Sequence, residues 1–176
     1  MNLVDEVKLS IREIPDFPKQ GILFKDITPL LSNAALSRKL TKYCAEQWTK
    51  EEIQVVVGVE SRGFLWGLPL AMALNAPFVP VRKQGKLPAK TESVRYDLEY
   101  GSATLEIHVY AFIPGQKVLI HDDLLATGGS ASAAAELVTK LGGKVAGFSF
   151  LIELSGLGGK DVLSKYSANL KPVVSY

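Results

Sequence analysis

The sequence predicts an α/β fold in which helices flank a central, mostly parallel sheet. Two observations lead to this prediction. Short apolar runs rich in β-branched residues recur along the chain, and the central ones are followed by a loop and then a helical pattern. A repeated order of strand, loop, helix and strand is typical of βαβ units, which build parallel sheets. The 176 residues, 47% of them hydrophobic, suffice for one domain with a sizeable core.

The first third of the chain is predicted to hold two helices. Amphipathic patterns indicate helices over about residues 2–13 and 34–50, and prolines punctuate the segment from Pro15 to Pro29. The single cysteine, Cys44, lies on the apolar stripe of the second helix. We interpret it as a buried structural thiol, because free cysteine behaves as a small hydrophobic residue.

The βαβ pattern begins after this region. A strand is predicted at 53–59, a helix at 64–74 and a second strand at 77–81. The same periodicities indicate a later unit in the same order, with a strand at 118–121, a helix at 131–141 and a strand at 145–154. In such sheets ligands bind outside the carboxyl ends of the strands.

Residues 82–102, RKQGKLPAKTESVRYDLEYGS, separate the two units. The segment is too long for a routine connection, and long irregular insertions are usually lids or disordered loops. A flexible, solvated loop is one interpretation, and a basic loop that closes over a ligand is the other. Residues 98–108 are predicted to return to the body of the protein as a strand.

Chemically distinctive residues follow the strand at 118–121. Asp122 and Asp123 precede the small residues ATGGS of 126–130, where a helix is about to begin. Small residues let backbone N–H groups surround an anion, and the helix N-terminus adds partial positive charge. A phosphate suits this loop, whereas the carboxylates suit hydroxyl groups or a hydrated Mg²⁺. A plain turn with a Ser or Thr helix cap remains the alternative for the loop alone.

A second distinctive strand exit is formed by Glu60, Ser61, Arg62 and Gly63, after the strand at 53–59. The arginine suits another anionic group. The two exits together therefore predict a ligand with a phosphate at one end, a diol in the middle and a further anion at the other end. Sugar phosphates are the class that fits.

Composition and motifs argue against other classes of function. The formal net charge is +2, without a run of about five or more like charges, which gives no support for nucleic-acid or membrane-surface binding. No signal peptide and no apolar span long enough to cross a membrane are found, so we expect a soluble, cytoplasmic protein. Dinucleotide-binding, P-loop, esterase and zinc-protease motifs are missing. We interpret His108 as a strand residue and His121 as a neighbour of the acid pair.

The motifs resemble those of type I phosphoribosyltransferases, and among them the adenine phosphoribosyltransferases. The stretch VLIHDDLLATGGS (118–130) is similar to the phosphoribosyl-pyrophosphate signature of the family. At matching spacing the chain also contains FPKQGILFKDITPLL, VGVESRGFLWG, VPVRKQGKLP, YDLEYG and LIELSGLGG. The resemblance implies a type I phosphoribosyltransferase fold as a single domain over 1–176. It further implies a small N-terminal hood over about 1–33 and a flexible catalytic loop at 82–102.

The resemblance implies a role for each matching residue. The 5-phosphate would be bound by Ala126, Thr127, Gly128, Gly129 and Ser130, and the ribose hydroxyls and Mg²⁺, the latter largely through water, by Asp122 and Asp123. Pyrophosphate would be bound by Ser61, Arg62, Gly63, Arg82, Lys83 and Lys86, next to a non-proline cis peptide between Glu60 and Ser61. Adenine would be contacted by Leu23, Phe24, Lys25 and Leu157. The catalytic residues would be Glu99, which handles the proton on adenine N7, Tyr100 and Lys83.

These roles imply transfer of a 5-phosphoribosyl group from phosphoribosyl pyrophosphate to N9 of adenine, giving AMP and pyrophosphate, by a homodimer that uses Mg²⁺. A 6-oxopurine phosphoribosyltransferase is an alternative, although such relatives carry a lysine where GFSFLIEL carries Glu153. A non-catalytic regulator that senses phosphoribosyl pyrophosphate is another, although such regulators tend to lose loop residues that this chain keeps. His121 stands where an apolar residue is usual, and we hypothesise that it makes activity depend on pH near neutrality.

Overall fold

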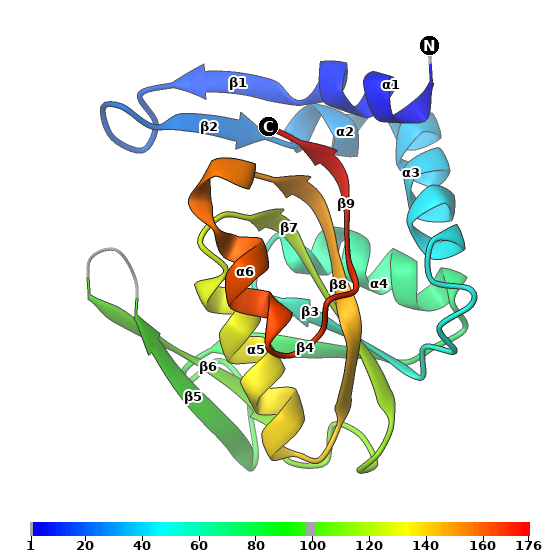
Figure 1. Ribbon diagram of the computed structural model, residues 1–176, viewed down its shortest axis with the longest axis vertical. Coiled ribbons are helices and arrows are strands. Elements are labelled where there is room, and N and C mark those ends of the chain that lie inside the picture. The colour runs from blue at the N-terminus through cyan, green and yellow to red at the C-terminus, as the bar shows by residue number, and fades with distance from the viewer. Residues whose placement is uncertain (1, 98–100) are drawn as a thin grey trace. The chain divides into compact units, whose positions relative to one another are not determined.

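The computed structural model describes residues 2–97 and 101–176 (Figure 1). The chain divides into two compact units, Met1–Tyr43 and Cys44–Tyr176, which we call the N-terminal unit and the C-terminal unit. Each unit is built around its own strands. In the described part of the chain, the N-terminal unit contains a two-stranded sheet and the C-terminal unit a seven-stranded sheet.

The N-terminal unit consists of short helices and a hairpin. Helix α1 (Leu3–Ser10) is followed by β1 (Arg12–Pro15), β2 (Leu23–Asp26), α2 (Thr28–Ser32) and the greater part of α3 (Ala34–Glu46). Asn2 caps α1, since its side-chain oxygen accepts a hydrogen bond from the N–H of Asp5 at 2.9 Å. The predicted helix at 2–13 was too long, because Arg12 and Glu13 pair with β2 in an antiparallel ladder.

The sheet of the C-terminal unit confirms the predicted α/β class. Its strands are β3 (Val55–Val59), β4 (Phe78–Lys83), β5 (Thr91–Asp97), β6 (Ser102–His108), β7 (Lys117–Leu125), β8 (Lys144–Glu153) and β9 (Leu170–Ser175), in the spatial order β5-β6-β4-β3-β7-β8-β9. Strands β4, β3, β7, β8 and β9 pair in parallel, whereas β6 is antiparallel to both β4 and β5. The sheet is therefore mostly parallel with an antiparallel hairpin at one edge.

Helices cover both faces of this sheet. Helix α5 (Gly129–Lys140) contributes Ala134, Leu137 and Val138 to the same buried cluster as Val57 and Ile120 of the central strands. Helix α4 (Gly63–Ala73) packs on the other face, where the rings of Phe64 and Phe78 meet edge to face at 5.8 Å. Figure 1 shows α5 and α6 (Gly159–Ser164) in front of the strands and α4 behind them.

The register of the two central strands brings both chemically distinctive exits together. Strand β3 pairs directly with β7, with Val57 opposite Ile120 and Gly58 opposite His121. The chain then leaves β3 at residue 60 and continues along β7 to residue 125 before α5 begins. Because parallel strands end at the same edge of a sheet, the residues after β3 and those at the end of β7 lie side by side.

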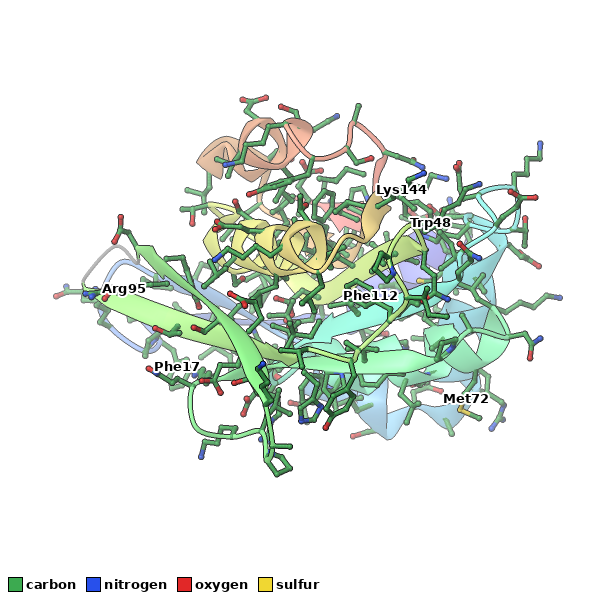
Figure 2. The ribbon with its side chains drawn as sticks, turned by 90° about the horizontal axis from the view of Figure 1, so that it is seen from below. Phe17, Trp48, Met72, Arg95, Phe112 and Lys144 are labelled. Carbon is green, nitrogen blue, oxygen red and sulfur yellow. The ribbon has the colours of Figure 1, made fainter. Side chains whose placement is uncertain are left out.

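The segment 82–102, which we expected to be a flexible loop, contains regular structure. Residues 91–97 form β5 and pair along their whole length with β6, which begins at Ser102 rather than at the predicted residue 98. Val94 and Tyr96 alternate on one face of β5 and pack against the core cluster. Arg95 lies near the end of this hairpin (Figure 2), where its Nε donates a hydrogen bond to Oγ of Ser102 at 2.8 Å. Glu99 and Tyr100 lie outside the described residues.

Candidate functional site

A cavity of about 420 Å³ lies at the carboxyl ends of β3 and β7, entirely within the C-terminal unit. Its walls come from the ends of four strands and the start of α5. They are formed by Glu60, Ser61, Arg62, Lys83, Tyr96, Asp97 and the continuous segment 122–131. The structure thus brings together Ser61, Arg62, Lys83, the acid pair and the whole ATGGS loop, as the sequence predicted. Gly63, Arg82, Lys86 and Leu157 were predicted for the site but do not line this cavity.

The loop 126–130 is a helix N-terminus open to the cavity. Helix α5 begins at Gly129 and has no side-chain hydrogen bond at its N-cap, Gly128, so the alternative of a plain Ser or Thr cap is not supported. Gly128 has a φ of +84°, which glycine adopts readily. The first N–H groups of a helix lack partners within the helix and favour negative charge. The loop can therefore hold a phosphate against the start of α5.

The two adjacent carboxylates are buried in the cavity wall. Asp122 is 9% exposed and Asp123 is 4% exposed. The N–H of Asp123 donates to Oδ1 of Asp122 at 2.9 Å, and Nε of Arg62 forms an ion pair with Oδ2 of Asp123 at 2.9 Å. Within the described residues Oδ2 of Asp123 accepts no aligned hydrogen bond, although the arginine is close. A buried oxygen in that position can still accept a hydrogen bond from a ligand.

Burial is the main influence on the pKa values of the carboxyl groups of Asp122 and Asp123. It raises the pKa of Asp122 well above its ordinary value, and the neighbouring charge of Asp123 raises it further. The pKa of Asp123 is also raised by burial, while the positive charge of Arg62 opposes the rise. Both carboxyl groups therefore favour a nearby proton, cation or hydroxyl donor over an unpartnered negative charge.

The exit of β3 forms the part of the wall next to the acid pair. The peptide between Glu60 and Ser61 is cis, which confirms the prediction from the family resemblance. Helix α4 begins at Gly63, where a Cβ atom would lie 2.9 Å from both Oδ1 of Asp122 and the carbonyl oxygen of His121. Only glycine lets the start of α4 approach the acid pair this closely.

Glu60 connects the exit of β3 to Arg82 and Lys83 at the end of β4 through hydrogen bonds. Its carboxylate accepts hydrogen bonds from Nε and Nη2 of Arg82, at 3.2 and 3.3 Å, and from the N–H of Lys83 at 2.9 Å. Burial alone would raise the pKa of Glu60, but these hydrogen bonds outweigh it and leave the pKa below its ordinary value. Nη1 of Arg82 also donates to the carbonyl oxygen of Lys86 at 3.0 Å. Arg82 and Lys86 thus lie beside the cavity wall rather than in it.

Sequence reasoning missed Tyr96 and Asp97, which line the cavity from the end of β5. A Cβ at Gly129 would lie 3.4 Å from the Tyr96 ring, so the tyrosine lies beside the loop 126–130. Burial, together with the negative charge of Asp122, raises the pKa of Tyr96. The alternation of Val94 and Tyr96 was the available signal, and it was hidden in a segment that we interpreted as a loop.

His121 does not behave as hypothesised. Its side chain is fully buried, and Nδ1 lies 3.2 Å from Oγ of Ser149 on the neighbouring strand. Burial lowers its pKa to about 4, so the imidazole is neutral near pH 7. The hypothesis that His121 titrates near neutrality was therefore wrong, because it ignored the cost of charging a buried ring.

The residues predicted to contact adenine are divided between the two units. Leu23, Phe24 and Lys25 belong to β2, where Phe24 meets Phe17 edge to face at 5.1 Å and Lys25 forms an ion pair with Glu13. Leu157 lies in the 3₁₀ turn η1 (Ser155–Leu157) of the C-terminal unit and is 51% exposed. Their joint role stays a prediction.

The donor set at the cavity suits one kind of metal ion. Among the described residues there is no group of three or more His, Cys, Asp or Glu side chains that could hold a metal alone. Two adjacent carboxylates are nevertheless present, and Mg²⁺ commonly binds through one or two carboxylates, retained waters and ligand phosphates. The acid pair therefore fits Mg²⁺ that arrives with a phosphorylated ligand.

In the described residues, no helix is long and apolar enough to span a membrane.

Comparisons with known proteins agree with this geometry. Residues 26–174 match the model of the phosphoribosyl transferase domain family. An adenine phosphoribosyltransferase of Sorangium cellulosum is 56% identical over 169 residues, which are 96% of this chain and 84% of that protein.

Solved structures lead to the same family. A crystal structure of adenine phosphoribosyltransferase from Thermoanaerobacter pseudethanolicus superposes with a TM-score of 0.95 at 48% identity, covering 98% of this chain and 99% of that one. The enzyme of Saccharomyces cerevisiae, crystallised with adenine and an imino-altritol bisphosphate, has a TM-score of 0.90 at 42% identity, with 98% of each chain covered. The chain belongs to the adenine phosphoribosyltransferases.

Proposed function

We propose that the chain transfers the 5-phosphoribosyl group of phosphoribosyl pyrophosphate to N9 of adenine, with AMP and pyrophosphate as products. Membership of the family supports the reaction, and the yeast relative crystallised with adenine supports the acceptor. The observation that carries the proposal is one cavity in which a helix N-terminus, two buried carboxylates, an arginine and a lysine meet. This set matches a ligand with a phosphate, a diol and a second anion.

In this proposal the loop 126–130 binds the 5-phosphate through backbone N–H groups and the hydroxyls of Thr127 and Ser130. Asp122 and Asp123 accept hydrogen bonds from the two ribose hydroxyls. Oδ2 of Asp123 supports this role, because it is paired with Arg62 at 2.9 Å but accepts no aligned hydrogen bond in the described residues, and a hydroxyl could donate one. The ligand would then lie along the end of β7 with its phosphate at α5.

The pyrophosphate is assigned to the exit of β3 and the end of β4. Ser61 and Arg62 line the cavity and would offer backbone N–H groups and one guanidinium, Gly63 follows them, and Lys83 adds a cation from the neighbouring strand. Arg82 and Lys86 lie just behind Lys83 and add positive charge to the same side. Cations in this position would stabilise the charge that develops on a departing pyrophosphate.

Mg²⁺ is proposed as the cofactor, held by Asp122 and Asp123 largely through water. When bound, it would neutralise phosphate charge and help pyrophosphate to leave. The protein itself contributes two carboxylates whose pKa values burial has raised, so a cation beside them is favourable.

The base is proposed to lie against Phe24 and Leu157, with Leu23 and Lys25 reading its edge through their backbone. Breaking the bond at the anomeric carbon passes through an oxocarbenium-like state, as in glycoside hydrolysis. As N9 of adenine attacks the anomeric carbon, the proton on N7 must leave the base, and Glu99 is proposed to accept that proton, with Tyr100 beside it. Both residues lie outside the described part of the structure.

Two properties of the whole molecule are also proposed. We place the enzyme in the cytoplasm, in keeping with a single, buried and reduced cysteine. We propose a homodimer that buries the outer face of α4, because Leu65, Leu68 and Met72 recur there at helical spacing and are 42%, 48% and 73% exposed. Figure 2 shows Met72 at the surface of the protein.

The homodimer is tested by light scattering after size exclusion. Leu68→Glu should shift the protein from dimer to monomer, whereas Val162→Glu, a change at an apolar residue on α6 that is 40% exposed, should leave a dimer. A wild-type monomer at micromolar concentration would refute the dimer.

The reaction is tested by incubating the protein with Mg²⁺ and phosphoribosyl pyrophosphate and offering adenine, hypoxanthine and guanine separately. AMP from adenine alone is expected, and product from hypoxanthine or guanine would favour the 6-oxopurine alternative. Bound phosphoribosyl pyrophosphate without any nucleotide product would favour the regulator. Glu99→Gln should lower kcat by about 10²–10⁴-fold as loss of an acid-base group does. Glu92→Gln is the matched control on the same hairpin, where Glu92 pairs with Lys140 at 3.6 Å away from the chemistry.

A further inference from the structure

Two side chains of β6 hold the backbone of the β4–β5 connection, residues 84–90, which we call the basic turn. Oε2 of Glu106 accepts a hydrogen bond from the N–H of Gly85 at 3.0 Å. Nε2 of His108 lies 2.7 Å from the carbonyl oxygen of Pro88. Glu106 and His108 are two residues apart on one strand, so their side chains leave the same face of the sheet. That face is opposite to the one on which Leu105 and Ile107 enter the core cluster.

Glu106 is unusual among acidic residues because it is buried. The residue is only 8% exposed, and a carboxylate is rarely buried without a partner. Its partner here is a backbone N–H, at a glycine whose φ is +75°. A hydrogen bond between an ionised acceptor and an N–H is about twice as strong as a neutral one. The start of the basic turn is therefore fixed by a side chain, beside the ladder bond from the N–H of Gln84 to the carbonyl of Thr104 at 3.1 Å.

The contact with His108 fixes the other end of the basic turn. A carbonyl oxygen only accepts, so Nε2 of His108 must carry the hydrogen in this pair. The bond forms with the neutral ring and with the charged ring alike, since Nε2 is a donor in both. Ala89 follows with a φ of +65°, a conformation that is unfavourable for a residue with a Cβ. It persists between two anchored carbonyls, that of Pro88 at His108 and that of Lys90, which accepts from the N–H of Val109 at 3.2 Å.

Lys86 lies between these two anchors of the basic turn, and Lys83 directly precedes the turn. Lys83 lines the cavity at one edge of the turn, and its N–H is held by Glu60 at 2.9 Å. The N–H of Lys86 donates to the carbonyl of Lys83 at 3.2 Å, while its own carbonyl accepts from Arg82 at 3.0 Å. The backbones of both lysines are thus held by hydrogen bonds, with Lys83 in the cavity wall and Lys86 beside it, and Glu106 and His108 hold the rest of the turn.

We propose that Glu106 and His108 are positioning residues that hold the basic turn so that Lys83 and Lys86 face the pyrophosphate group. The inference rests on the proposed function, since it assigns those lysines to pyrophosphate. Neither Glu106 nor His108 lines the cavity, so each acts through the backbone of the turn and not on the substrate. A misplaced turn would weaken binding of phosphoribosyl pyrophosphate and leave binding of adenine unchanged.

The first test compares two variants of His108 by steady-state kinetics. His108→Leu removes the donor and should raise KM for phosphoribosyl pyrophosphate about 3–10-fold, the worth of one hydrogen bond, with KM for adenine changed less than twofold. His108→Gln retains an N–H donor and should restore the wild-type KM within about twofold. Equal increases in both KM values, or no increase, would overturn the proposal.

Hydrogen exchange supplies a measurement that does not depend on catalysis. Glu106→Leu removes the acceptor for the N–H of Gly85, and exchange of the amides of residues 84–90 should become faster, whereas Glu106→Gln keeps an acceptor oxygen and should exchange as the wild type does. His108→Leu should accelerate the same amides and keeps the test usable if Glu106→Leu does not fold. Unchanged exchange in a folded His108→Leu protein would refute the anchoring. An inactive wild-type protein with normal anchoring would instead refute the proposed function.

Discussion

Gly159 is the position at which a small change should disturb the phosphate loop most clearly, because it supports that loop without touching the ligand. It is the first residue of α6, and its Cα faces the backbone of the loop. A Cβ built there would lie 2.3 Å from the carbonyl oxygen of Ala126 and 2.7 Å from Cδ1 of Leu125. Ordinary C···O contacts are about 3.3–3.6 Å. Gly159→Ala therefore requires the backbone of residue 126 and the start of α6 to separate by about 1 Å.

The size of the effect follows from that displacement. A misplacement of about 1 Å in groups that position a substrate can cost about 10²-fold in rate. We therefore expect kcat/KM for phosphoribosyl pyrophosphate to fall about 100-fold in Gly159→Ala, equivalent to about 2.7 kcal/mol of transition-state stabilisation. The KM for adenine should change little, since the displaced loop is proposed to bind the phosphate end of the other substrate.

The chain provides a matched control three residues earlier. Gly156 lies in η1, and a Cβ at that position would meet no atom within 4 Å. Gly156→Ala makes the same chemical change next to the same helix without a clash. Initial rates of AMP formation are compared for both variants below their melting temperatures, which thermal unfolding supplies. A folded Gly159→Ala protein whose kcat/KM lies within threefold of that of Gly156→Ala would refute the reasoning.

Three further predictions concern burial and charge elsewhere. Burial raises the pKa of the Cys44 thiol to about 12, so a disulfide reagent at pH 8 should label the folded protein far more slowly than the unfolded one, and prompt labelling would contradict the buried position. Hydrogen bonds from Thr28 are the largest influence that lowers the pKa of Asp26 to about 2 from 3.8, so this carboxylate stabilises the fold above about pH 4, and that stability is lost as the pH falls towards 2. Urea unfolding should show a weaker acid dependence in Asp26→Asn, and identical curves would disprove the linkage. Gly147→Ala places a Cβ 2.5 Å from the Trp48 ring and should cost about 1–3 kcal/mol of unfolding free energy, with KM values unchanged, in denaturant titrations.

The phosphate loop and the acid pair could be predicted from sequence because their signals are local. An apolar run ending in Asp122 and Asp123 and passing into ATGGS specifies a strand, a loop and a helix start within a few residues. The same holds for the exit of β3 at Ser61 and Arg62. General rules for parallel sheets then place both exits at one edge, and the register of β3 and β7 places them side by side.

The parts that escaped prediction depend on partners distant in sequence. Residues 12 and 13 were predicted to end a helix and residues 91–97 to form part of a loop, and each segment becomes a strand only by pairing with a second strand, β2 or β6. Tyr96 was missed with β5, since its contact with Gly129 joins two segments that no local pattern connects. His121 was misjudged for a related reason, as its pKa follows from burial by the neighbouring strands.

The carboxylates around the basic turn explain how a site for a highly charged ligand keeps its cations available. Glu60 and Glu106 both accept backbone N–H groups, from Lys83 and Gly85 respectively. Among the described residues neither carboxylate forms an ion pair with Nζ of Lys83 or Lys86, while Arg82 takes the remaining capacity of Glu60. An acid that neutralised these lysines directly would have to be displaced by pyrophosphate, at the cost of a buried, unpaired charge. The two acids instead hold the backbone of the turn and form no close ion pair with either ammonium group in the described residues, although the charge of Lys86 contributes to the lowered pKa of Glu60. Removing Glu106 should therefore loosen the turn.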